Sequence, residues 1–149
     1  MTRAQFATIV VKALGLTPKA NNVFADVPAD EWYTAFVGTA YTYGIVNGTS
    51  ATTFEPEASI TKQEAATMVA RAAKLCGMDT QLETYEILNA LAQFGDYVTV
   101  DDWARESIAF CYSEDILDQN DLDIEPKRAI LRCEIAQMLY NMLGSAKLL

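Results

Sequence analysis

Apolar residues recur at the i, i+3, i+4, i+7 spacing of an amphipathic helix in three segments of the chain. These segments are residues 2–14, 61–76 and 131–143, and a glycine stands just past the end of each. Glycine is the usual residue that terminates a helix. The pattern therefore predicts three helices of one design, each with an apolar stripe that the rest of the fold must cover.

Shorter helices are predicted between these three. Asp30 is a candidate N-cap for a helix over 31–43, whose inner side would carry Trp32, Phe36, Val37, Ala40 and Tyr41. Residues 102–114 predict a matching helix, and residues 78–93 predict a connecting helix or linker. Every predicted element is a helix, so the expected fold class is all-α.

The three long helices begin in the same way. Thr61 and Glu64 have the spacing of a capping box, in which each residue binds the backbone N–H of the other. Lys62 then takes the first helical position, where the helix dipole disfavours a cation. Arg3 and Arg132 hold the same position in the other two helices. This repetition favours an anion-binding interpretation over solvated surface cations.

The second half of the chain repeats the first. Phe-x-Asp, a Trp-bearing helix, a loop, a proline and a capped helix follow one another twice. Matched residues lie 70 or 71 positions apart, by subtraction within the pairs Phe24–Phe94, Trp32–Trp103, Pro56–Pro126 and Lys62–Arg132. Such agreement indicates an internal repeat.

The complete unit is carried by five ordered motifs: Phe24-x-Asp26-Val27, Trp32, Gly44-Ile45-Val46-Asn47-Gly48, Phe54-x-Pro56 and Ile60-Thr61-Lys62-Gln63-Glu64. This ordered set resembles the S-layer homology repeat. The resemblance implies a pseudo-threefold, all-helical spindle with a central three-helix bundle. It divides the chain into the second half of a first repeat (1–16), a complete repeat (24–77), a connecting segment (78–93) and a degenerate repeat (94–144).

The resemblance also implies a function. S-layer homology repeats hold surface proteins non-covalently on bacterial cell-wall polysaccharides, often ones that carry ketal-linked pyruvate. The expected location is extracellular, at the cell surface or cell wall, and other surface-protein domains are further expected partners. The first repeat lacks its Trp-bearing half, so we expect a fragment, or a missing half supplied elsewhere, with any signal peptide outside this fragment.

The candidate ligand-binding residues are Arg3, Asp26, Trp32, Gly44, Gly48, Lys62, Gln63 and Arg132. Structural interpretations compete with this one. Trp32 and Trp103 at helical spacing favour the core over sugar stacking, and Asp26 and Asp96 favour a local Asx-type turn over a sugar contact. Gly44 and Gly48 either let a ligand approach the backbone or supply a positive φ, and both alternatives remain open.

The degenerate repeat departs from the motif. Asp115 and Gln119 replace the loop glycines, and Leu131 replaces the capping threonine. Asp118, Asp121 and Asp123 make its loop acidic, which should repel an anionic polymer even though Arg132 remains. The spacing does not fit a calcium loop, so a solvated acidic loop is favoured and no metal site is expected.

Composition excludes several classes of function. A net charge of −9 disfavours nucleic acid as a partner. No apolar run reaches the roughly 18 residues of a membrane span. The chain has no histidine and no catalytic constellation, so neither enzyme activity nor a cofactor is expected. The three cysteines are expected to be buried free thiols.

One alternative function remains. The chain could be a structural or protein-interaction module whose glycan sites have eroded. The acidic degenerate repeat and the net charge of −9 favour that hypothesis.

Overall fold

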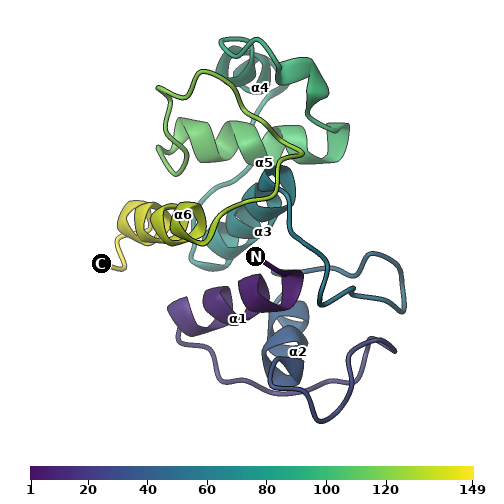
Figure 1. Cartoon of the computed structure of the whole chain (residues 1–149). Helices are drawn as coiled ribbons and strands as arrows, with labels where there is room; N and C mark the ends of the chain where they lie inside the picture. The colour runs from purple at the N-terminus through teal and green to yellow at the C-terminus, as the bar shows by residue number, and fades with distance from the viewer. The chain divides into compact units, whose positions relative to one another are not determined.

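The structure is a computed structural model that describes all 149 residues and contains six α-helices, one short 3-10 helix and no strand (Figure 1). The all-α prediction is therefore confirmed. The chain forms two compact units, Met1–Ile60 and Thr61–Leu149. None of the helices combines the length and the apolar character that a membrane crossing requires.

The first unit contains α1 (Arg3–Ala13) and α2 (Thr34–Thr42), which pack against each other. Its core is made of fully buried apolar side chains from both helices and the following loop, among them Phe6, Val10, Val37, Ile45 and Phe54. The prediction of a helix from residue 31 with Asp30 as its cap is wrong. The helix begins at Thr34, and Tyr33 occupies the N-cap position without a side-chain hydrogen bond.

The second unit contains α3 (Lys62–Leu75), α4 (Thr84–Leu91), η1 (Tyr97–Thr99), α5 (Asp102–Ser113) and α6 (Arg132–Ser145). Figure 1 shows α5 between α4 and α3, and α3 also packs against α6. The predicted connecting helix is thus α4. The expected central three-helix bundle would need α1 beside α3 and α6, and that arrangement stays a prediction.

Two of the three predicted helix stops are confirmed. Gly15 and Gly77 take φ values of +66° and +92°, the left-handed conformation that glycine adopts without strain. The prediction for Gly144 is wrong, because α6 continues through it to Ser145, and Lys147 takes the left-handed conformation instead, with φ +60°.

The cysteine prediction is correct for one residue. All three thiols are free, but only Cys111 is buried, whereas Cys76 is partly exposed and Cys133 is exposed. Cys133 occupies the position of Gln63 in the repeat, and that position is exposed at the start of α6.

Candidate functional site

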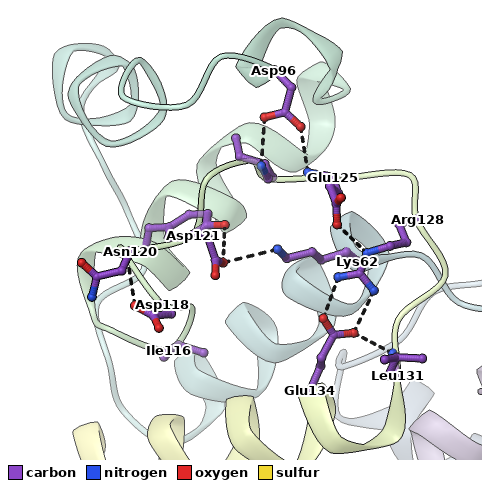
Figure 2. Close-up of polar contacts among 12 residues, drawn as sticks. Lys62, Asp96, Ile116, Asp118, Asn120, Asp121, Glu125, Arg128, Leu131 and Glu134 are labelled. Atoms are coloured by element: carbon purple, nitrogen blue, oxygen red, sulfur yellow. Dashed lines mark hydrogen bonds and ion pairs between the residues drawn. The ribbon is translucent and has the colours of Figure 1, made fainter.

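A carboxylate clamp ties the first turn of each repeat to its proline-bearing loop. The two oxygens of Asp26 accept from the backbone N–H groups of Phe54 and Glu55, at 2.8 and 2.7 Å. Asp96 makes the same pair of bonds in the second unit, at 2.9 and 2.8 Å (Figure 2). The expected local Asx-type turn is therefore wrong, because each clamp joins residues 28 or 29 positions apart.

Main-chain carbonyl groups close the N-termini of α1 and α3. Arg3 donates its backbone N–H to the carbonyl oxygen of Ala58 at 2.9 Å, and Lys62 makes the equivalent bond to Arg128 at 2.9 Å. The next residue of each helix binds the proline carbonyl of the same loop, at 3.0 and 2.8 Å. The first two N–H groups of both helices are thus occupied, so an anion there would have to be held by side chains.

The predicted capping boxes are present in α1 and α3. Thr61 Oγ1 accepts from the backbone N–H of Glu64 at 3.3 Å, and Glu64 Oε1 accepts from the Thr61 N–H at 3.3 Å. Leu131 has no hydroxyl to offer at the start of α6. There only the reverse bond forms, from the Leu131 N–H to Glu134 Oε2 at 2.8 Å.

Arg3 is buried, with 5% of the residue exposed. Its Nε donates to the Phe54 carbonyl oxygen at 2.8 Å and its Nη2 donates to the Asn47 carbonyl oxygen at 3.0 Å. The guanidinium carbon also lies 4.8 Å from the centre of the Phe54 ring, a cation–π distance. Arg3 is therefore no solvated surface cation, and it holds the loop that contains Gly44 and Gly48.

Lys62 is equally buried, at 5% exposure. Its Nζ lies 3.6 Å from Asp121 Oδ2 in the acidic loop of the degenerate repeat (Figure 2). Asp121 also accepts from the hydroxyl of Tyr112 at 3.1 Å. Burial, with the nearby Asp121 carboxylate adding to it, raises the pKa of Tyr112, so this hydroxyl stays a donor. Each buried cation thus faces the loop of the repeat that follows it.

A cavity of about 430 Å³ opens beside Lys62, and we call it the Lys62 cavity. Its volume falls within the range of small-molecule sites, about 300–1,000 Å³. It is lined by residues of the acidic loop, of α6 and of the segment just before α6, which are Asp115, Ile116, Leu117, Asp118, Asp121, Ile130, Glu134, Gln137, Met138 and Asn141. Acceptors, donors and apolar side chains therefore meet in one concave surface.

Arg128 is a residue that the sequence patterns did not single out. Its Nη1 and Nη2 donate to the two carboxylate oxygens of Glu134, at 3.0 and 2.6 Å, and its Nε donates to Glu125 at 2.7 Å (Figure 2). The hydrogen bonds from Arg128 lower the pKa of Glu134. Arg128 thus orients the Glu134 carboxylate, which lines the Lys62 cavity. The two residues are six positions apart on either side of a turn, a spacing that belongs to no helical or strand period, so the sequence gave no signal for the pair.

Gln63 is buried at 4% exposure and binds Asp101, the residue that precedes α5. Its Nε2 donates to Asp101 Oδ2 at 2.8 Å, and its Oε1 accepts from the Asp101 backbone N–H at 3.1 Å. The bond to Oδ2 lowers the pKa of the Asp101 carboxyl, and Lys127 adds a weaker lowering. Gln63 therefore ties α3 to α5.

The two tryptophans are exposed, contrary to the core prediction. Trp32 is 56% exposed and Trp103 is 57% exposed. Tyr33 and Ala104, each one position later, are the buried residues, at 4% and 0%. Trp32 packs edge-on against the ring of Tyr33, with 5.3 Å between ring centres. Both indole rings remain available for stacking on a sugar.

The two loop glycines have different roles. Gly44 takes φ +74° with open space around it, which supports the conformational interpretation. A Cβ on Gly48 would lie 2.3 Å from the Ser50 carbonyl oxygen and 2.6 Å from the Phe24 ring, so this glycine allows the loop to pack on itself. Asp115, at the position of Gly44, also takes a left-handed φ of +56°.

The structure brings some candidate residues together and separates others. Arg3, Gly44 and Gly48 gather around one loop of the first unit, and Lys62 lies at the cavity of the second. Arg132 is exposed at the start of α6 and does not line that cavity. No three acidic or cysteine side chains of the chain are grouped so that they could hold a metal ion. Ligand binding by the candidate residues stays a prediction.

The sequence model of the S-layer homology domain matches residues 23–66. The chain is also similar to the Surface-layer 125 kDa protein of Lysinibacillus sphaericus, with 29% identity over 140 residues, 91% of this chain and 11% of that protein. The Middle cell wall protein of Brevibacillus brevis is 40% identical over 77 residues, 48% of this chain and 7% of that protein.

A third relative has an enzyme name. Exoglucanase XynX of Acetivibrio thermocellus is 30% identical over 146 residues, 96% of this chain. The chain spans only 13% of the exoglucanase, and a smaller share of the other two relatives. The matched segment is thus a small part that proteins of different names have in common.

Proposed function

We propose that this chain anchors a bacterial surface protein by binding cell-wall polysaccharide non-covalently, because residues 23–66 match the sequence model of the S-layer homology domain. The observation that carries the proposal is the shared segment: a surface-layer protein and an exoglucanase both contain sequence similar to nearly the whole chain. A segment common to such different proteins performs a task that both need, and attachment to the cell surface is such a task. The location that follows is the cell surface or cell wall.

The finer proposal concerns the sugar. A carboxylate-bearing residue, such as one with ketal-linked pyruvate, would bind close to Arg3 or Lys62. Both cations are buried, and a buried cation interacts with a carboxylate more strongly than a solvated one does. Beside Arg3 stands the Gly44–Gly48 loop, and beside Lys62 stands the Lys62 cavity. The exposed rings of Trp32 and Trp103 would add stacking surface for further sugars.

The contacts of Arg3 and Lys62 also favour the second hypothesis, a structural or protein-interaction module. Arg3 already donates to two carbonyl oxygens, and Lys62 already faces Asp121. Cations that hold neighbouring loops have a structural role without any glycan. A structural or protein-interaction module therefore remains the second candidate function.

Binding to purified cell wall separates the two functions. The chain should sediment with intact wall and fail to sediment with wall stripped of its secondary polymer. Equal sedimentation with both preparations, or with neither, would favour the structural module.

Calorimetric titration with a pyruvylated wall fragment tests the finer proposal. Charge-assisted hydrogen bonds contribute about 1.5–3 kcal/mol each, so Lys62→Ala or Arg3→Ala should weaken binding about ten- to a hundredfold at the occupied site. Lys62→Arg should hold or improve affinity, because a guanidinium can grip a carboxylate at two points. Lys74→Ala, which removes an exposed cation from the same helix, is the matched control. Identical heats for all variants would exclude both cations.

A further inference from the structure

Asn47 is the one asparagine of the chain that a glycine follows, since every other asparagine precedes a residue with a side chain. Asn47 is exposed, in the loop that follows α2. The backbone nitrogen of the next residue can attack the side-chain amide carbon of an asparagine. Glycine hinders that attack least, because it has no side chain. The Asn47–Gly48 peptide is therefore the place in the chain where such a ring closure meets the least hindrance.

The attacking nitrogen at this position has no acceptor in the chain. The Gly48 N–H makes no hydrogen bond, although the residues on either side of the pair are held. Val46 donates its N–H to the Ala40 carbonyl oxygen at 3.3 Å, and Thr49 donates its N–H to the Thr53 carbonyl oxygen at 2.9 Å. An amide N–H that is not hydrogen-bonded to the chain gives up its proton to solvent base without any local opening of the fold. The Gly48 nitrogen is thus ready to be deprotonated in the folded chain.

Arg3 binds the carbonyl oxygen of the same peptide group. Its Nη2 donates to the Asn47 carbonyl oxygen at 3.0 Å, and the residue is 5% exposed. Loss of the Gly48 proton spreads negative charge over the nitrogen and this oxygen, because amide resonance joins the two atoms. A buried guanidinium placed in advance on the oxygen stabilises that charge. Arg3 therefore favours the deprotonated peptide, which is the form that attacks.

We propose that Asn47 is a site of spontaneous deamidation and that Arg3 promotes the reaction. Hydroxide takes the Gly48 proton, and the nitrogen forms a bond to Asn47 Cγ. The bond from Cγ to the side-chain nitrogen breaks, and that nitrogen takes a proton from water and leaves as ammonia. Water then adds to either carbonyl carbon of the succinimide ring, which opens to aspartate or isoaspartate. The reaction consumes only water and involves no oxidation or reduction.

The products alter the loop that Arg3 holds. Isoaspartate routes the backbone through the former side-chain carbon, so the chain gains one methylene group at residue 47. The loop is already packed closely there, since a Cβ on Gly48 would lie 2.3 Å from the Ser50 carbonyl oxygen. Aspartate instead adds a carboxylate to the residue whose carbonyl oxygen binds the buried cation. Either product changes the surroundings of Arg3, and this inference does not depend on polysaccharide binding.

Incubation of the folded chain at mildly alkaline pH, followed by peptide mass spectrometry, tests the site. Asn47 should lose its amide about tenfold faster than Asn89 and Asn120, which are also exposed but precede residues with side chains. An isoaspartyl methyltransferase should label the peptide that contains residue 47. A stable Asn47 amide, or loss at Asn89 or Asn120 at the same rate, would overturn the assignment.

Arg3→Met tests the role of the guanidinium. In the folded variant Asn47 should deamidate about tenfold more slowly, because one donor to the developing charge is lost. The rates at Asn89 and Asn120 should not change. In denaturant the contact with Asn47 is absent, so the variant and the unmodified chain should lose the Asn47 amide at the same rate. Equal rates for the two folded chains would exclude a role for Arg3.

A second measurement needs no substitution, so it stands even if Arg3→Met does not fold. The unmodified chain is incubated with and without denaturant at one pH, and the rate at Asn47 is compared between the two samples. The folded chain keeps the contact of Arg3 with the Asn47 carbonyl oxygen and should lose the amide faster. Faster loss in denaturant would show that the fold protects Asn47, and would overturn the promoting role of Arg3.

Discussion

The side-chain amide of Gln63 makes two hydrogen bonds to Asp101. Its Nε2 donates to Asp101 Oδ2 at 2.8 Å, and its Oε1 accepts from the backbone N–H of Asp101 at 3.1 Å. The two residues are 38 positions apart, one at the first turn of α3 and the other at the N-cap of α5. This pair fixes where α5 begins, and α5 supplies the Tyr112 hydroxyl that holds Asp121 at the Lys62 cavity.

We expect Gln63→Ala to lower the free energy of unfolding by about 1–2 kcal/mol, because it removes two hydrogen bonds, one of them to a charged group. Denaturant unfolding measures this. Gln137→Ala, on an exposed position of α6, should change the same quantity by less than about 0.5 kcal/mol. Equal losses in both variants would show that the Gln63 amide does not stabilise the fold.

Stability should decline in acid. The pKa values of Asp101 and Glu134 are lowered in the folded chain, by hydrogen bonds from Gln63 and Arg128 respectively. A lowered pKa contributes stability that is fully present above the unfolded value, about pH 4–5, and is lost as the pH falls through the folded value. The unfolding free energy should therefore fall between about pH 5 and pH 3.

Arg128→Met isolates one part of that pH dependence. The variant should be about 1 kcal/mol less stable than the unmodified chain at pH 7, a value discounted for the partial exposure of the ion pair, and the difference should shrink towards pH 3. Arg105→Met, which removes an exposed ion pair with Asp102, is the control. A difference that stays constant with pH would contradict the assigned role of Arg128.

Removing the N-cap of α3 and adding one to α6 should change the free energy of unfolding in opposite directions. Thr61→Ala should cost about 0.5–2 kcal/mol of unfolding free energy, because the Glu64 N–H loses its acceptor. Leu131→Thr should be neutral or stabilising, since Leu131 is 57% exposed and a threonine there would supply the missing cap. Thermal melts of the two variants provide the measurement, and a clearly destabilised Leu131→Thr would mean that this leucine packs against something.

The buried face of α6 can be tested with adjacent residues. Leu139 is 4% exposed and Tyr140 is 65% exposed. Leu139→Ala should cost about 2–5 kcal/mol, whereas Tyr140→Ala should cost little. Denaturant unfolding of both variants checks the face, and a loss under about 0.5 kcal/mol for Leu139→Ala would show that the face is misassigned.

The start of α3 and the ends of α1 and α3 could be predicted from sequence because their signals are local. Thr61 and Glu64 lie one turn apart, and Gly15 and Gly77 stop helices through their own conformational freedom. The clamp of Asp26, by contrast, reaches across 28 residues. A carboxylate before a helix is compatible with both a local turn and a distant pair, and only the folded chain distinguishes them.

The tryptophan prediction failed for a geometric reason. Adjacent helical residues point about 100° apart, so an error of one position moves a side chain from the core to the surface. In α5 the buried stripe includes Ala104 and Ile108, which leaves Trp103 outside it. In the first unit, residue 32 lies before α2 begins, so helical spacing does not apply to Trp32.

The partner of Lys62 was unpredictable for another reason. The sequence showed a cation in one repeat and an acidic loop in the next, with no signal that the two are in contact. Their contact depends on how α3 packs beside the loop that follows α5, which no spacing along the chain encodes.

The hydrogen bonds that connect the starts of α1 and α3 to their neighbouring loops join backbone N–H groups to backbone carbonyl groups. Any residue except proline presents the same N–H, and every residue presents the same carbonyl. Mutation can therefore erase the recognisable motif of a repeat while its connection to the preceding helix persists. Residues 126–129 connect to α3 as residues 56–59 connect to α1, although the repeat around them has lost its glycines and its capping threonine. Under the proposed anchoring function, such a scaffold would leave the groups that face a ligand open to substitution, so the same architecture could be adapted to a different wall polymer.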